Sequence, residues 1–82
     1  MQLKFTESAE KELVGLDKTI SHRIYEKTLQ LQDNPYGLGS HKLEGGKGYR
    51  IRIGGYRVIY TIDKSSKTVI VTKIGHRREV YR

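Results

Sequence analysis

Hydrophobic residues follow two different spacings along this 82-residue chain. Up to residue 33, apolar positions recur every three or four residues, the spacing of one helix face. After residue 48 they alternate with polar ones, the spacing of a strand with one buried face. The patterns predict an α+β fold of order β-α-α-β-β-β. We expect one domain over residues 1–82, a small, mostly antiparallel sheet with a helical hairpin packed on one face.

Short local signals bound the first half of the fold. Residues 2–5 alternate and predict a first strand. Thr6 or Ser8 is a suitable N-cap for a first helix, and Asp17 for a second, because their side-chain oxygens accept hydrogen bonds from free backbone N–H groups. Asn34-Pro35 ends the second helix. The glycine-rich stretch 36–48 lacks the spacing of a phosphate-binding loop and is predicted to be a flexible loop.

The second half predicts a hairpin whose register follows from its turn. Gly54-Gly55 suits a two-residue turn because glycine tolerates positive φ. Ile53 then lies opposite Tyr56, and Arg52 lies opposite Arg57, on an exposed face that also holds Arg50. Like charges directly opposite one another destabilise a sheet, so this arrangement favours a role in anion binding over a merely solvated face. Residues 68–74, apolar almost throughout, predict a strand that is central in the sheet or covered on both faces.

Positive charge is concentrated in the second half of the chain. Residues 1–41 hold five basic and six acidic side chains, whereas residues 42–82 hold eleven basic and three acidic ones. Such a one-sided field attracts a polyanion. Tyrosines 49, 56 and 81 lie among these cations and favour RNA, whose unstacked bases bind aromatic rings.

Several classes of protein are disfavoured by composition. The chain has no cysteine, which excludes disulfides and thiolate metal sites. Its three histidines lack metal-site spacing, and its basic half has too few carboxylates for a two-metal nuclease. No apolar run approaches the roughly 18 residues of a membrane span, and no signal peptide is recognisable, so we expect a soluble cytoplasmic protein. We expect neither metal nor cofactor.

The last seven residues combine several groups used in RNA chemistry. His76, Arg77, Arg78, Tyr81 and Arg82 bring an imidazole, three guanidiniums and a phenol into a short tail. Guanidinium binds phosphate through a planar fork, and phenol or imidazole can transfer a proton.

The sequence resembles the RelE toxins of the RelE/ParE superfamily, the toxin halves of type II toxin–antitoxin pairs. The resemblance covers nearly the whole chain. Its most specific parts are the segment from Tyr49 to Tyr60, YRIRIGGYRVIY, and the ending from Ile74 to Arg82, IGHRREVYR. It also includes the Asn34-Pro35 helix stop and the segment KLEG at 42–45.

This resemblance implies a ribosome-dependent mRNA endonuclease. The ribose 2′-hydroxyl of the A-site codon would attack the adjacent phosphorus without a metal ion, leaving a cyclic phosphate. The implied partners are the ribosome and a RelB-like antitoxin encoded nearby, and we expect the free toxin to be a monomer. The resemblance makes Arg57, Arg77 and Tyr81 catalytic candidates, with His76 as a second candidate to Tyr81 for proton transfer. The expected RNA contacts are Arg50, Arg52, Arg78, Lys47 and Arg82.

Two other functions use the same features. A ParE-like inhibitor of DNA gyrase would share the fold, although such inhibitors generally lack the set of Arg57, Arg77 and Tyr81. A non-catalytic RNA- or ribosome-binding module would use the same basic face.

Overall fold

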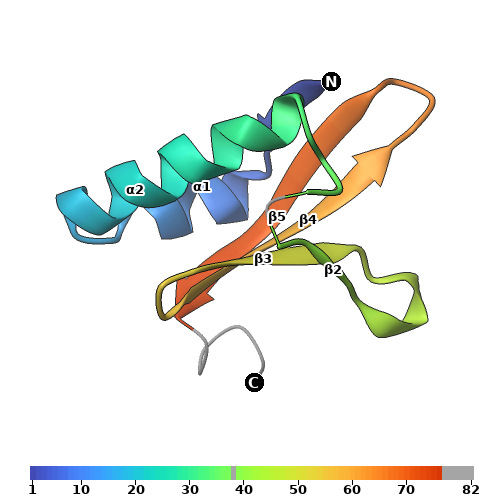
Figure 1. Cartoon of the computed structure of the whole chain (residues 1–82). Coiled ribbons are helices and arrows are strands. Elements are labelled where there is room, and N and C mark those ends of the chain that lie inside the picture. Colours follow the sequence, from blue (N-terminus) through green and yellow to red (C-terminus); the bar gives the residue numbers. More distant parts are fainter. Residues whose placement is uncertain (38, 77–82) are drawn as a thin grey trace.

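The computed structural model describes residues 1–37 and 39–76. The predicted tail residues Arg77, Arg78, Tyr81 and Arg82 therefore lie outside the described residues. Two helices cover one face of a twisted sheet, and no helix covers the other face in the described part of the chain (Figure 1). We call the first face the helix face and the second the open face. The α+β class and the helical hairpin on one face are confirmed.

The helices begin at the predicted caps. Strand β1 (Gln2–Phe5) leads into α1 (Glu7–Val14), where the Thr6 hydroxyl accepts a hydrogen bond from the Ala9 N–H at 3.1 Å. Helix α2 (Lys18–Leu29) begins at Asp17, whose carboxylate accepts one from the Thr19 N–H at 3.1 Å. A 3₁₀ turn, η1 (Gln30–Gln32), ends this segment before Asn34-Pro35.

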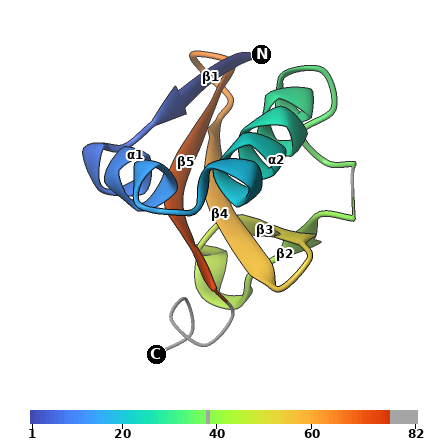
Figure 2. The ribbon, with the colours of Figure 1, turned by 90° about the vertical axis from the view of Figure 1, so that its left-hand side faces the viewer.

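The sheet has the order β1-β5-β4-β3-β2. Strands β3 (Tyr49–Ile53), β4 (Tyr56–Asp63) and β5 (Thr68–His76) form an antiparallel meander, and β1 pairs with β5 in parallel. The predicted central position of the last strand is confirmed, because β5 lies between β1 and β4 (Figure 2). The predicted hairpin register is also confirmed, with Ile53 opposite Tyr56 and Arg52 opposite Arg57. Gly54 supplies the positive φ of the turn, at 61°.

The glycine-rich loop is more ordered than predicted. It contains a two-residue strand, β2 (His41–Lys42), paired with β3, and a 3₁₀ turn, η2 (Glu44–Gly46). The Leu43 N–H donates to the Gly48 carbonyl at 2.7 Å and closes this hairpin. Gly48 has φ 106°, and a Cβ there would collide with the Tyr60 carbonyl oxygen, so only glycine fits. Two paired residues are too short for an alternating pattern, which explains why the strand was not predicted.

The core lies between the helix face and the helices. Its fully buried members come from both layers: Ala9, Ile24, Leu31, Ile51, Val58, Tyr60, Val69, Val71 and Ile74. A β-bulge in β5 places Thr72 between the pairs Ile59–Lys73 and Tyr60–Val71. Because the bulge shifts the alternation by one residue, Val71 and Ile74 both reach the helix face although they are three residues apart.

Candidate RNA-binding face

The open face gathers cations from three neighbouring strands. Residues paired directly across antiparallel strands lie on the same face, so the register places Arg52 and Arg57 side by side. Arg50 lies two residues from Arg52 on β3 and shares its face. Ile59 lies two residues from Arg57 on β4 and so shares its face. Lys73 of β5 pairs with Ile59 and therefore lies on this face too. We call Arg50, Arg52, Arg57 and Lys73 the cation cluster.

Arg57 was predicted to lie exposed on this face, but it is buried, with only 3% of its surface exposed. It lies on β4 between Arg52 of β3 and Gly75 of β5, whereas Arg52 is exposed because β2 pairs only with Tyr49 and Arg50 of β3. One terminal nitrogen of Arg57 donates to the Tyr56 carbonyl at 3.2 Å. Within residues 1–37 and 39–76, its Nε and the Nη1 of Arg50 are buried without a hydrogen-bond partner. Buried donors of this kind are usually satisfied, so these two nitrogens are suited to receive an anion.

His76 does not join the cation cluster. His76 pairs with Tyr56 and shares its face of the sheet. Because Tyr56 directly precedes Arg57 in β4, that face is opposite to the one that holds Arg57. The His76 and Tyr56 rings meet edge to face with centroids 5.5 Å apart. Lys47 also lies apart from the cluster, exposed just after η2 in the hairpin between β2 and β3.

Tyr49 and Tyr56, which the sequence suggested as stacking partners for RNA bases, lie on the helix face rather than beside the cation cluster. Tyr49 stacks on Tyr60 at 5.7 Å within the helix face, and Tyr36 meets Tyr49 edge-on at 5.6 Å. The Tyr60 hydroxyl donates to the Pro35 carbonyl at 2.6 Å. Burial is the main cause that raises the pKa of this phenol. The pleat of the strand explains the outcome, because a tyrosine and an arginine at adjacent positions point to opposite faces of the sheet.

Sequence reasoning missed two groups on the open face. Lys73 was hidden because the bulge at Thr72 changes the alternation of β5. His41 was assigned to a loop, yet it pairs directly with Arg50 and shares its face. The segment KLEG after His41 marked this region, but nothing in the sequence indicated a two-residue strand.

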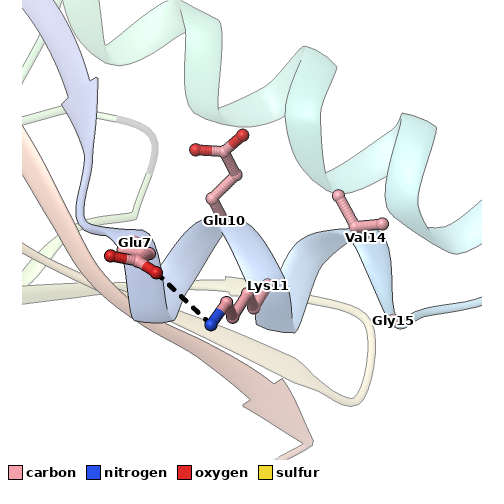
Figure 3. A pocket seen from close by; sticks show the side chains of 5 residues that line it. All are labelled: Glu7, Glu10, Lys11, Val14 and Gly15. Carbon is pink, nitrogen blue, oxygen red and sulfur yellow. Dashed lines mark ion pairs between the residues drawn. The ribbon is translucent and has the colours of Figure 1, made fainter.

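Positive charge continues past the edge of the sheet. A groove of about 520 Å³ lies between α2 and β3, with Arg23, Glu26 and Lys27 on one side and Arg52 on the other, so that its lining holds three cations and one carboxylate. A hollow of about 390 Å³ on α1 has a different character (Figure 3). There Glu7 pairs with Lys11 at 3.3 Å, both side chains being largely exposed. The α1 hollow thus lacks grouped cations, and the candidate site is the open face.

Metal-ligating groups do not cluster in the described part of the chain. No group of three or more histidine, aspartate or glutamate side chains there could hold a metal ion. No helix within residues 1–37 and 39–76 has the length and apolar character needed to span a membrane.

Comparisons with known proteins identify the family. The model of the ParE toxin of type II toxin–antitoxin systems matches residues 3–81, and the chain belongs to this family. A RelE-like toxin protein of Escherichia coli is 34% identical over 79 residues, covering 93% of this chain and 82% of that protein. The predicted resemblance to RelE toxins is therefore confirmed.

Solved structures of toxins share the fold. The RelBE2 toxin–antitoxin complex of Mycobacterium tuberculosis contains a chain that matches with a TM-score of 0.83 and 26% identity, covering 93% of this chain and 96% of that chain. The archaeal RelE–RelB complex of Pyrococcus horikoshii matches with a TM-score of 0.79 and 30% identity, covering 93% of each. The protein is thus a type II toxin of the RelE/ParE superfamily.

Proposed function

We propose that this toxin cleaves messenger RNA in the ribosomal A site, without a metal ion, through attack of the ribose 2′-hydroxyl on the adjacent phosphorus. The observation that supports this best is the buried guanidinium of Arg57, whose Nε has no hydrogen-bond partner among the described residues. A fixed, partly desolvated donor stabilises charge that develops on phosphoryl oxygens more strongly than a solvated one.

The cation cluster divides this work between binding and catalysis. Arg50 and Arg52 are proposed to hold RNA phosphates, because guanidinium forks bind them in a bidentate way. Arg57 is proposed to stabilise the transition state. Following the family resemblance, Arg77 shares this role and Tyr81 transfers a proton or stacks on a base. Arg78, Arg82 and Lys47 are proposed as further phosphate contacts, with His76 as the second candidate to Tyr81.

Single-turnover cleavage on ribosomes programmed with a defined codon tests this function. We expect Arg57→Ala to slow cleavage by about 100- to 1,000-fold, the usual loss when one transition-state donor is removed. Lys64→Ala is the matched control, since it also removes one positive charge but lies in the β4–β5 turn. It should cleave at the wild-type rate. Chelators should leave the activity intact, and inactivation by EDTA of reactions containing intact ribosomes would contradict the metal-free mechanism.

The ParE name of the family model supports gyrase inhibition as a second candidate. A supercoiling assay with the same purified toxin separates the two functions. Under the proposed function, gyrase remains active at toxin concentrations that cleave ribosome-bound mRNA. Inhibition of gyrase without RNA cleavage would overturn the proposal in favour of the ParE-like function.

We also propose a RelB-like antitoxin as the partner of this toxin. The toxins in the Mycobacterium tuberculosis and Pyrococcus horikoshii complexes were solved with their antitoxins. The net positive second half of the chain would attract an acidic or amphipathic segment. Co-expression with the adjacent open reading frame should relieve growth arrest and give a complex. Failure of both would argue against the pairing.

A further inference from the structure

The proposed cleavage, on which this inference rests, needs a group that accepts the proton of the 2′-hydroxyl. The cation cluster contains three guanidiniums and one ammonium, which are donors at neutral pH. Among the strand residues that the structure describes on the open face, three other groups are titratable: Lys4 of β1, which adds a further ammonium, His41 of β2 and Asp63 of β4. Histidine is the side chain that exchanges protons most readily near neutrality.

The backbone places His41 within the cluster. His41 pairs directly with Arg50, whose side chain belongs to the open face. Directly paired residues have Cβ atoms about 4.5–5.5 Å apart, so the imidazole lies beside the Arg50 side chain. Lys42, the next residue of β2, pairs with Tyr49 and points to the other face. His41 is exposed to solvent and therefore accessible to RNA.

The strand that holds His41 has a defined register. The Leu43 N–H donates to the Gly48 carbonyl at 2.7 Å, directly after β2. Before it, the Ser40 N–H donates to the Gly37 carbonyl at 3.0 Å. Turns on both sides therefore fix the position of His41 against β3.

The other described candidates are less suitable. His76 lies on the helix face against Tyr56. His22 lies on α2, where its Nε2 is 3.6 Å from the Glu26 carboxylate. Asp63 is four residues along β4 from Ile59, about 13 Å at 3.3 Å per residue, and its carboxylate accepts hydrogen bonds from Ser65.

We propose that His41 is the general base of this toxin, which leaves Tyr81 with its other proposed role, stacking on an RNA base. Its neutral imidazole takes the proton of the 2′-hydroxyl while a lone pair of the 2′-oxygen forms the new bond to phosphorus. The bond from phosphorus to the 5′-oxygen breaks, and its electrons leave with that oxygen. The 5′-oxygen takes a proton from water, and the imidazolium gives its proton to the resulting hydroxide. The charged group facing His41 from β3 is Arg50, which binds the phosphate that is attacked.

Single-turnover cleavage on programmed ribosomes across pH tests this role. We expect His41→Gln to slow cleavage by about 100- to 10,000-fold, the usual contribution of a positioned acid or base. The wild-type rate should rise with pH, because general-base catalysis needs an imidazole that can accept a proton, and this rise should be smaller in His41→Gln. His22→Gln is the matched control and should keep both the rate and the profile. Added imidazole should partly restore His41→Ala.

Four outcomes would overturn the inference. If wild-type toxin does not cleave, the proposed function fails and this role fails with it. If the wild type cleaves and His41→Gln cleaves equally fast with the same profile, only this role fails. The His41→Arg variant keeps a positive charge but cannot accept a proton. If it cleaves at the wild-type rate, the contribution of His41 is purely electrostatic. If His41→Gln is so much less stable that unfolding accounts for its slower cleavage, and imidazole does not rescue His41→Ala, His41 has a structural role.

Discussion

The two faces of the sheet are built from alternate residues of the same strands, yet they follow opposite rules. On the helix face, Ile51 and Val58 are fully buried in an apolar core. On the open face, the neighbouring positions Arg52 and Arg57 place like charges side by side. The first arrangement stabilises the fold, whereas the second opposes it by electrostatic repulsion. A sheet can therefore concentrate charge on one face because burial on the other supplies the stability.

The largest difference in stability between the two faces is expected when a core side chain is truncated. Ile51→Ala removes a fully buried side chain from the helix face and should lower the free energy of unfolding by about 2–5 kcal/mol. Arg52→Ala, one residue away on the open face, should change it by less than about 1 kcal/mol, as exposed substitutions usually do. Denaturant unfolding measures both variants. Equal losses would show that the open face also supports the fold.

A second prediction concerns the edge where β5 extends beyond β1. There the Ile74 N–H donates to the Glu12 carboxylate of α1 at 3.0 Å, which joins helix and sheet. Glu12→Ala leaves this donor without its acceptor and should cost about 1.5–3 kcal/mol in thermal or denaturant unfolding. Glu12→Gln is the control, because its amide oxygen can still accept. If the two variants lose the same stability, the carboxylate charge matters more than the hydrogen bond.

Local signals explain which parts of the fold could be predicted. The caps Thr6 and Asp17 and the Gly54-Gly55 turn act over a few residues, and all three were identified correctly. The parallel pairing of β1 with β5 joins residues more than sixty positions apart, and no local pattern indicates it. The bulge at Thr72 likewise depends on the partner strand.

In the candidate site, too, only the features set by local signals could be predicted from the sequence. Arg52 and Arg57 were placed together because a hairpin register follows from its turn. The burial of Arg57 could not be predicted, since it depends on the position of β4 between two other strands. Lys73 and His41 required the bulge and the short strand β2, which are both features of tertiary pairing.

A third prediction tests how the helix face anchors the loop that leads to β2. Tyr60→Phe removes the 2.6 Å hydrogen bond to the Pro35 carbonyl and should cost about 0.5–1.5 kcal/mol. Burial, the largest cause, raises the pKa of Tyr60 in the folded protein, so the unfolded chain loses this proton first. Wild-type stability should therefore fall as pH rises above about 10, more steeply than that of Tyr60→Phe. Tyr25→Phe, at an exposed position, should behave like the wild type.

The smallest expected effect concerns the carboxylate at the far end of the open face. The Asp63 carboxylate accepts hydrogen bonds from the Ser65 hydroxyl at 2.7 Å, the Ser65 N–H at 3.1 Å and the Ser66 N–H at 3.3 Å. The Ser65 hydroxyl is the main cause that lowers the pKa of Asp63. A carboxylate with a lowered pKa stabilises the fold above its unfolded pKa of about 3.9, and this contribution is lost as pH falls through the folded pKa.

Asp63→Asn should therefore be slightly less stable than the wild type at pH 7, and the difference should disappear in strongly acidic solution. Thermal unfolding from pH 7 down to pH 2 measures it, with Asp33→Asn as the control for losing one exposed carboxylate. Asp63→Asn should also leave RNA cleavage unchanged, because Asp63 holds the β4–β5 turn rather than the RNA. A loss of cleavage with stability unchanged would place Asp63 in the reaction and would contradict the assignment of His41 as the base.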